Sequence, residues 1–383
     1  MSWPSCGPLA ADPRGRVRFF AATLPGLGTL LRDEAAAQDA LEPEDEVGFD
    51  GRADLVFFRV RRGARFPLHG LRLAEDVFVT ISDARSGPPA RVAASLVTRT
   101  GLERALSVRA AYVRHLSPAM TFRVITRVVD EGRFRRSELR SAVERAIRAG
   151  RPRWRIADPA ELEVWAVEYR RARFVSGLRL SDQRLRQHGG GRARERHGAL
   201  RPVAAAAMVR LAGAGPGRLL DPCCGSGTIV QEALAAGWDA QGSDVDREAV
   251  SVARANAAGA VIRRADAVDL PHPDGAFDAV VTNLPFGRQF RPAEQGRRSP
   301  AGRGVAGGNT AARTSAALSS GGLSTAGWVP DVLREAARVT RPGGRVVVLV
   351  PSVPDHVAGL TLSGSYPLRL LGVRARIWVF GRA

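Results

Sequence analysis

The stretch LLDPCCGSGT, residues 219–228, places a glycine-rich turn between a short apolar run and a helix-like segment. Glycines in such a turn let the backbone approach a ligand closely, and the start of the following helix favours negative charge. The turn lacks the Lys-Ser/Thr pair of a phosphate-binding loop. It also lacks the third glycine of a dinucleotide fingerprint, and its acid precedes the glycines. The stretch therefore predicts a strand, turn and helix that bind another kind of ligand.

Carboxylates also follow the next two predicted strands. Asp244 closes the strand predicted at residues 239–243, and Asp266 follows the strand predicted at residues 261–264. The first position suits a ribose diol, and Asp266 can accept a hydrogen bond from an adenine amino group. Each acid alone is more typical of a helix cap. Because acids in this order mark one edge of an open parallel sheet, we favour the ligand-binding interpretation.

The strand predicted at residues 277–282 is followed by Asn283-Leu284-Pro285-Phe286. The Asn283 side-chain oxygen and the Leu284 carbonyl can each accept a hydrogen bond from one NH₂ group, and Phe286 can stack on the ring that carries it. Such a site orients an exocyclic amine without a covalent nucleophile. Taken alone, the motif is more typical of an ordinary strand-exit turn with a buried aromatic.

The second half of the chain alternates strands and helices, which predicts an α/β fold with a parallel sheet. Residues 368–371 and 376–380 predict a closing hairpin. Residues 291–326 consist mostly of Gly, Ser, Ala, Arg, Pro and Thr, and we expect an inserted disordered loop there. The first half has an α+β pattern. Its predicted elements include a helix at residues 136–149 with Ser137 as N-cap, and strands at residues 163–169 and 174–180.

Length and composition indicate a protein with two folded modules. The 383 residues, 45% of them hydrophobic, are enough for two packed modules. No apolar run is long enough to span a membrane and the first residues do not resemble a signal peptide, so we expect a cytoplasmic protein without membrane contact. Three cysteines, two of them adjacent, predict neither disulfides nor a structural metal site.

The net charge of +19 favours a polyanionic partner. All 57 cationic residues are arginines, and residues 122–201 hold 21 of them against 10 acids. Arg170, Arg171 and Arg173 bridge two predicted strands and are our candidates for RNA contacts. A solvated charged face is the competing interpretation, and attraction to a membrane is the weaker one because no long basic amphipathic helix is predicted.

The stretches DPCCGSGTIVQEA, GSDVD, ADAVDLP and NLPFG, in this order, resemble class I S-adenosylmethionine-dependent methyltransferases of the amino-methylating type. NLPFG is a variant of their N-P-P-Y motif. The resemblance extends from about residue 200 to the C-terminus and implies a Rossmann-like sheet that binds S-adenosylmethionine. FFAATLPGL and TFRVITRV in the first half resemble the ferredoxin-like plus THUMP region of RNA methyltransferases.

The resemblance implies four parts of the chain. They are a ferredoxin-like region at 1–120, a THUMP-like RNA-binding region at 121–185, a linker at 186–199 and the methyltransferase domain at 200–383, with the insertion at about 291–326. It also implies site residues. The cofactor-binding set is Asp221, Gly225, Ser226, Gly227, Asp244 and Asp266, and the target-base set is Asn283, Leu284, Pro285 and Phe286.

Two features depart from the family pattern. Cys223 and Cys224 stand in the glycine loop, where we expect small packing residues, whereas a nucleophilic cysteine for carbon methylation would be expected near the fourth strand. The low-complexity stretch interrupts the region beyond NLPFG.

In its order of modules the chain is most similar to the THUMP-domain tRNA guanine-N2 methyltransferases. This similarity implies methylation of the exocyclic amine of a guanosine in tRNA, with RNA as the partner. The alternatives are an rRNA guanine-N2 methyltransferase, a DNA adenine-N6 methyltransferase and an RNA-binding protein that has lost catalysis. The sequence predicts neither the modified position, nor mono- or dimethylation, nor the oligomeric state.

Overall fold

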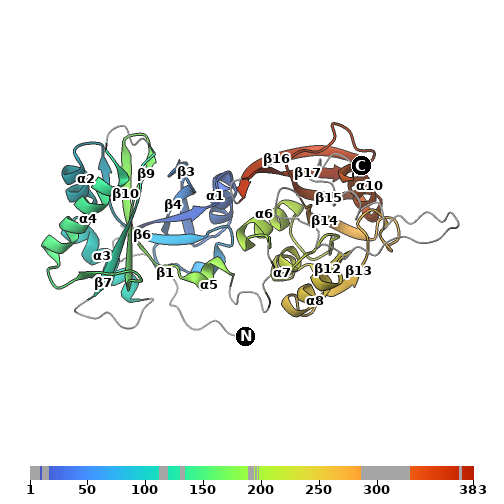
Figure 1. Ribbon diagram of the computed structural model, residues 1–383, viewed down its shortest axis with the longest axis horizontal. Helices are drawn as coiled ribbons and strands as arrows, with labels where there is room; N and C mark the ends of the chain where they lie inside the picture. Colours follow the sequence, from blue (N-terminus) through green and yellow to red (C-terminus); the bar gives the residue numbers. More distant parts are fainter. Residues whose placement is uncertain are drawn as a thin grey trace, which may run out of the picture. The chain divides into compact units, whose positions relative to one another are not determined.

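The computed structural model describes two units of the chain, Met1–Gly191 and Arg192–Ala383 (Figure 1). The described residues are 9–10, 17–111, 120–129, 134–188, 194, 196, 198–285, 328–370 and 373–383. None of the helices among them is both long and apolar enough to cross a membrane.

The first unit is organised around an eight-stranded sheet with the order β3-β4-β2-β6-β10-β9-β7-β8. Strands from both sides of residue 120 belong to this one sheet, since β6 pairs directly with β10. The strands are β2 (Arg18–Thr23), β3 (Leu41–Phe49), β4 (Asp54–Val60), β6 (Asp76–Arg85), β7 (Thr121–Arg127), β8 (Arg155–Ile156), β9 (Leu162–Arg170) and β10 (Arg173–Arg179). A separate short pair joins β1 (Leu9–Ala10) to β5 (Arg65–Phe66).

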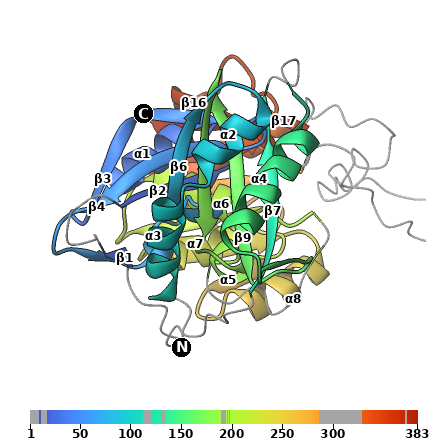
Figure 2. The same cartoon turned by 90° about the vertical axis from the view of Figure 1, so that its left-hand side faces the viewer.

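Three helices cover one face of this sheet, as Figure 2 shows for α2, α3 and α4. Their bounds are Pro89–Leu96, Arg99–Ala110 and Arg136–Gly150, while α1 (Gly28–Ala36) packs on β3 and β4. The short η1 (Leu68–Gly70) and α5 (Gln183–Arg186) complete the unit.

The sheet of the first unit curls, so that its edge strand β3 lies against β9. Gly48 makes this approach possible, because a Cβ atom there would lie 3.0 Å from the Cβ of Tyr169. Aromatic rings fill the curl. Phe20 stacks on Phe78 with ring centroids 4.6 Å apart, and Tyr169 meets Phe57 edge-on at 4.9 Å.

The second unit contains a seven-stranded sheet with the order β13-β12-β11-β14-β15-β17-β16. The first five strands in this order are parallel, and β17 is antiparallel to both of its neighbours. Strand order reverses between β11 and β14, which is where ligands bind in open α/β sheets. The strands are β11 (Arg218–Asp221), β12 (Asp239–Asp244), β13 (Val261–Arg264), β14 (Phe277–Asn283), β15 (Thr340–Val350), β16 (Leu360–Leu370) and β17 (Val373–Arg382). The expected α/β fold with a Rossmann-like sheet and a closing hairpin is confirmed.

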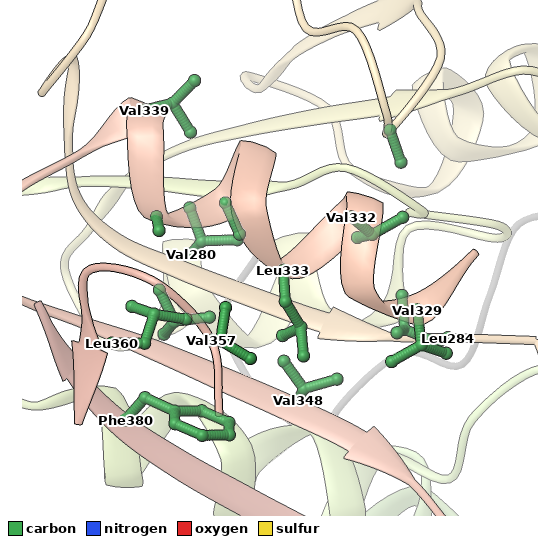
Figure 3. Packing of buried hydrophobic residues seen from close by; sticks show 14 of the residues in the cluster. Val280, Leu284, Val329, Val332, Leu333, Val339, Val348, Val357, Leu360 and Phe380 are labelled. Carbon is green, nitrogen blue, oxygen red and sulfur yellow. The ribbon is translucent and has the colours of Figure 1, made fainter. Parts of the chain in front are cut away.

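Helices bury the central strands of this sheet. In α10 (Val329–Val339) the residues Val329, Val332, Leu333 and Ala336 follow the spacing of one helix face, and all are buried. Figure 3 shows this face on Val280 of β14 and Val348 of β15. The sheet is contacted as well by α6 (Pro202–Ala212), α7 (Thr228–Ala235) and α8 (Arg247–Asn256).

Some expectations about local structure differ from the structure. The helix expected at residues 136–149 is present, but Ser137 is not its N-cap. The helix begins after Arg135, whose backbone N–H donates to the Glu138 carboxylate, so the cap is made by an acid in the first turn. The expected insertion at 291–326 lies outside the described residues.

Candidate active site

The glycine-rich loop joins β11 to α7 at the carboxyl edge of the second sheet. Gly225 and Gly227 have φ values of +53° and +82°, in the left-handed region that favours glycine. A Cβ atom at Gly227 would lie 3.2 Å from the Cα of Ala253, so this glycine also permits close packing on α8. A Cβ atom at Gly225 would meet nothing within 4 Å, so this part of the loop faces open space.

Asp244, the last residue of β12, binds the glycine loop. Its carboxylate accepts hydrogen bonds from the backbone N–H groups of Gly225, at 2.9 Å, and Asp246, at 3.0 Å. Each carboxylate oxygen thus has one partner and retains a second lone pair. Burial raises the pKa of Asp244, and the two N–H groups oppose that rise. This carboxylate could accept two hydroxyl hydrogens from a diol in front of the loop.

Asp221, the last residue of β11, is the most deeply buried acid of the site, with 1% of its surface exposed. Its carboxylate accepts a hydrogen bond from the backbone N–H of Cys223 at 3.2 Å. Burial raises the pKa of Asp221 to about 7, and the Thr282 hydroxyl and the Cys223 N–H oppose part of this rise. A cationic ligand beside it would favour the ionised form.

Asp266 follows β13, as expected, and its carboxylate accepts a hydrogen bond from the backbone N–H of Val268 at 3.2 Å. The residue is half-buried. Asp221, Asp244 and Asp266 therefore follow three adjacent strands, because β13, β12 and β11 are neighbours in the sheet.

Asn283 ends β14 on the other side of the reversal in strand order. The parallel pairing of β14 with β15 places Asn283 opposite Leu349, whose carbonyl accepts from the N–H of Leu284 at 3.2 Å. Leu284 is fully buried and fixes the exit of the strand. The Oδ1 of Asn283 is buried and has no hydrogen-bond partner among the described residues. Phe286 lies outside the described residues, so its stacking role stays a prediction.

A buried acceptor without a partner points to a ligand that supplies the missing donor. The Oγ of Ser243, beside Asp244, is also buried and has no partner in the described part of the chain. Together with the open face of Gly225 and the spare lone pairs of Asp244, these atoms fit a polar cofactor with a diol.

The two cysteines of the loop are packing residues in this geometry. Cys224 is buried, and the half-buried Cys223 packs against the apolar cluster under α10. Burial raises the pKa of both thiols, and the charges of Asp221 and Asp244 act in the same direction. Neither thiol therefore ionises readily at neutral pH.

Asn256 reaches this loop, and Arg196 reaches the start of α8, from distant parts of the sequence; the motifs of the sequence predict neither contact. The Nδ2 of Asn256 donates to the carbonyl of Ser226 at 2.9 Å and to that of Arg194 at 3.0 Å. Arg196 forms an ion pair with Asp246. Part of the expected linker is thus held on the second unit. No motif in the sequence signals these contacts, because they depend on how α8 packs on the loop.

The candidate RNA-binding arginines lie at the turn between β9 and β10. Arg170, Arg171 and Arg173 are all exposed. The strand register places Arg173 opposite both Arg170 and Arg85, so three arginines form a row across three strands. Only Arg170 of this row has an acidic partner among the described residues, Glu46, at 2.8 Å.

Residues 190–298 match the family model described as the RMKL-like methyltransferase domain. The second unit therefore carries a methyltransferase domain of the S-adenosylmethionine-dependent class. The methyltransferase class and its cofactor thus agree with the sequence-based expectation.

Two solved structures share the fold over nearly the whole chain. TrmN from Thermus thermophilus is 23% identical, with a TM-score of 0.67, and the alignment covers 96% of this chain and 100% of that one. A predicted N6-adenine-specific DNA methylase from Listeria monocytogenes is 16% identical, with a TM-score of 0.58 and coverage of 96% and 97%. No curated protein matched the chain.

S-adenosylmethionine supplies an electrophilic methyl group on a positively charged sulfur. We propose that Gly225, Ser226 and Gly227 shape its binding surface, that Asp244 binds its ribose diol and that Asp266 binds its adenine. In the same proposal, Asp221 supplies negative charge near its cationic groups.

Replacing Asp244 by Ala should weaken cofactor binding at least tenfold. Hydrogen bonds to a charged group contribute roughly 1.5 to 3 kcal/mol, and tenfold in affinity corresponds to about 1.4 kcal/mol. Asp244→Asn keeps one acceptor oxygen and should show an intermediate loss. Asp239→Ala, at the opposite end of β12, is the matched control. Unchanged affinity of Asp244→Ala in calorimetry would exclude the assigned role.

Replacing Asp221 by Asn should stabilise the cofactor-free protein above pH 7 while weakening cofactor binding. The raised pKa means that the stabilising contribution of Asp221 is complete below about pH 4 and is lost as pH rises through about 7. The resulting difference in unfolding free energy is up to about 4 kcal/mol at pH 8.

The two measurements are denaturant unfolding at pH 5 and pH 8, and calorimetry with S-adenosylmethionine. At pH 5 the stabilising effect of Asp221→Asn should be less than half of its effect at pH 8, because Asp221 is then still protonated in the folded protein and ionises only on unfolding. A variant less stable than wild type at pH 8 would contradict the assignment of a buried, strained charge.

Proposed function

We propose that the chain transfers a methyl group from S-adenosylmethionine to the exocyclic N2 amine of a guanosine in tRNA. The observation that carries this proposal is the buried Oδ1 of Asn283 at the carboxyl edge of the sheet, which has no hydrogen-bond partner within the described part of the chain. An acceptor in this position suits an N–H donor. The arginine row of the first unit supports RNA as the partner.

The target amine is a weak nucleophile, because its lone pair is delocalised into the guanine ring. The Oδ1 of Asn283 and the carbonyl of Leu284 would accept its two N–H hydrogens and turn the lone pair towards the methyl group. Catalysis by such preorganised acceptors consists of positioning and electrostatics. No covalent nucleophile takes part, in keeping with two cysteines whose raised pKa keeps them as thiols.

Base pairing buries this amine, so the target nucleotide has to leave its stack. Phe286, the last residue of the Asn283-Leu284-Pro285-Phe286 motif, would stack on the extruded base. The first unit would hold the rest of the RNA through phosphates and shape, which is the usual basis for recognition of structured RNA.

The purified chain, incubated with S-adenosylmethionine and an unmodified tRNA transcript, should produce N2-methylguanosine. Asn283→Ala should lower the single-turnover rate by on the order of 10², the scale for loss of one preorganised polar group, with little change in cofactor affinity. Cys223→Ala is the control and should retain activity.

Nucleoside mass spectrometry separates the alternatives. N2-methylguanosine formed only in rRNA would overturn the choice of tRNA as substrate. N6-methyladenine formed in DNA would overturn the choice of guanine as target base. A chain that binds the cofactor and RNA but methylates nothing would be an inactive RNA-binding protein.

Replacing Arg170, Arg171 and Arg173 together by Gln should weaken tRNA binding and flatten its dependence on salt. Each lost phosphate contact removes roughly one from the slope of log K against log salt. The control triple, Arg61→Gln, Arg99→Gln and Arg140→Gln, removes exposed arginines that have acidic partners. Filter binding at several salt concentrations measures the slope. Equal slopes for the two triples would show that Arg170, Arg171 and Arg173 belong to a solvated face.

A further inference from the structure

The hairpin of β16 and β17 continues the second sheet beyond β15 (Figure 1). The strand pairings align Asn283 with Leu349, Leu349 with Ile377, and Ile377 with Tyr366. Arg374 precedes Ile377 by three residues. At about 3.3 Å per residue, it lies roughly 10 Å beyond the level of Asn283. The hairpin therefore extends on the side of the sheet where a target base would arrive.

The outer part of this hairpin carries two arginines that face each other. Arg369 and Arg374 are directly paired across the two strands, and both are exposed. Like charges at directly opposed positions destabilise a sheet. Neither has an acidic partner in the part of the chain that the structure describes. Stability of the hairpin thus gives no reason for this pair.

Arg376 adds a third positive charge on the same face of β17, because it follows Arg374 by two residues. Its guanidinium lies 5.5 Å from the centroid of the Trp378 ring and donates to the Oγ of Ser365 at 3.1 Å. Its Nε is buried and has no partner among the described residues. The three side chains Arg369, Arg374 and Arg376 form what we call the hairpin cluster.

We propose that the hairpin cluster binds phosphates of the RNA strand that flanks the target nucleotide. This inference rests on the proposed function and adds a contact in the catalytic unit to those of the first unit. Guanidinium groups bind phosphate oxygens through two parallel hydrogen bonds, which fix orientation as well as position. A phosphate between Arg369 and Arg374 would also remove their mutual repulsion.

The opposed pair distinguishes this interpretation from an ordinary solvated surface. Some of the other exposed arginines of the second unit have acidic partners, such as Arg334 with Asp331 and Arg341 with Asp278. Those ion pairs are neutral locally and offer little to a polyanion. Because the hairpin cluster has no such compensation, its positive charge remains available beside the site.

The test is the double variant Arg369→Gln/Arg374→Gln in the full chain, with the unmodified tRNA transcript as probe. The KM for tRNA should rise about tenfold, the rate at saturating tRNA should stay within about twofold, and the slope against log salt should flatten by about 1 to 2. Cofactor affinity should not change. The control is Arg334→Gln/Arg341→Gln, which should behave like wild type.

A second variant, Arg369→Glu, excludes a fold defect as the cause. It places opposite charges across the ladder, so its melting temperature should equal or exceed that of wild type while tRNA binding weakens further. Wild-type KM and salt slope in the double variant would overturn the hairpin inference and leave the proposed function intact. A wild-type chain that neither binds nor methylates the transcript would overturn both.

Discussion

The hydrogen bond from the Gly225 backbone to the Asp244 carboxylate connects the two parts on which the site depends. It joins the loop after β11 to the end of β12. The parallel register, which pairs Asp221 with Gly242, brings the two ends to the same level. Because adjacent parallel strands end at one edge, the sheet places a left-handed glycine and a carboxylate within one hydrogen bond. Asn256 then braces the same loop from α8.

This arrangement concentrates negative charge in a place where burial opposes it. The charge of Asp244 raises the pKa of Asp221, in addition to the effect of burial. If this edge of the sheet had only a structural role, replacing one of the two acids by an amide would make the folded protein more stable. Retaining both is understandable if a cation completes the site, which is what a sulfonium cofactor provides.

The sequence predicts site residues that lie at the end of a single strand. It does not predict contacts that depend on how distant strands pair. The glycine loop, the acids after three strands and Asn283 after β14 could be predicted, because each follows from residue types at a strand end. Gly48 against Tyr169 could not be, since it requires the curl of an eight-stranded sheet. The pairing of Arg369 with Arg374 could not be predicted either. A hairpin was expected, but which residues pair depends on the position of its turn. The prediction of Ser137 as a helix cap was wrong, because the carboxylate of Glu138 in the first turn accepts from the backbone N–H of Arg135 instead.

The position of β17 between β15 and β16 has a consequence for the order of folding. Residues 373–382 are made late but lie inside the sheet, and Phe380 belongs to the cluster under α10. The second unit cannot close its core during synthesis until these residues have left the ribosome. The first unit, whose strands all precede residue 180, can fold while the rest of the chain is still being made. The arginine-rich unit is then exposed before the second unit has closed, so under the proposed function an early encounter with RNA would be binding without methylation.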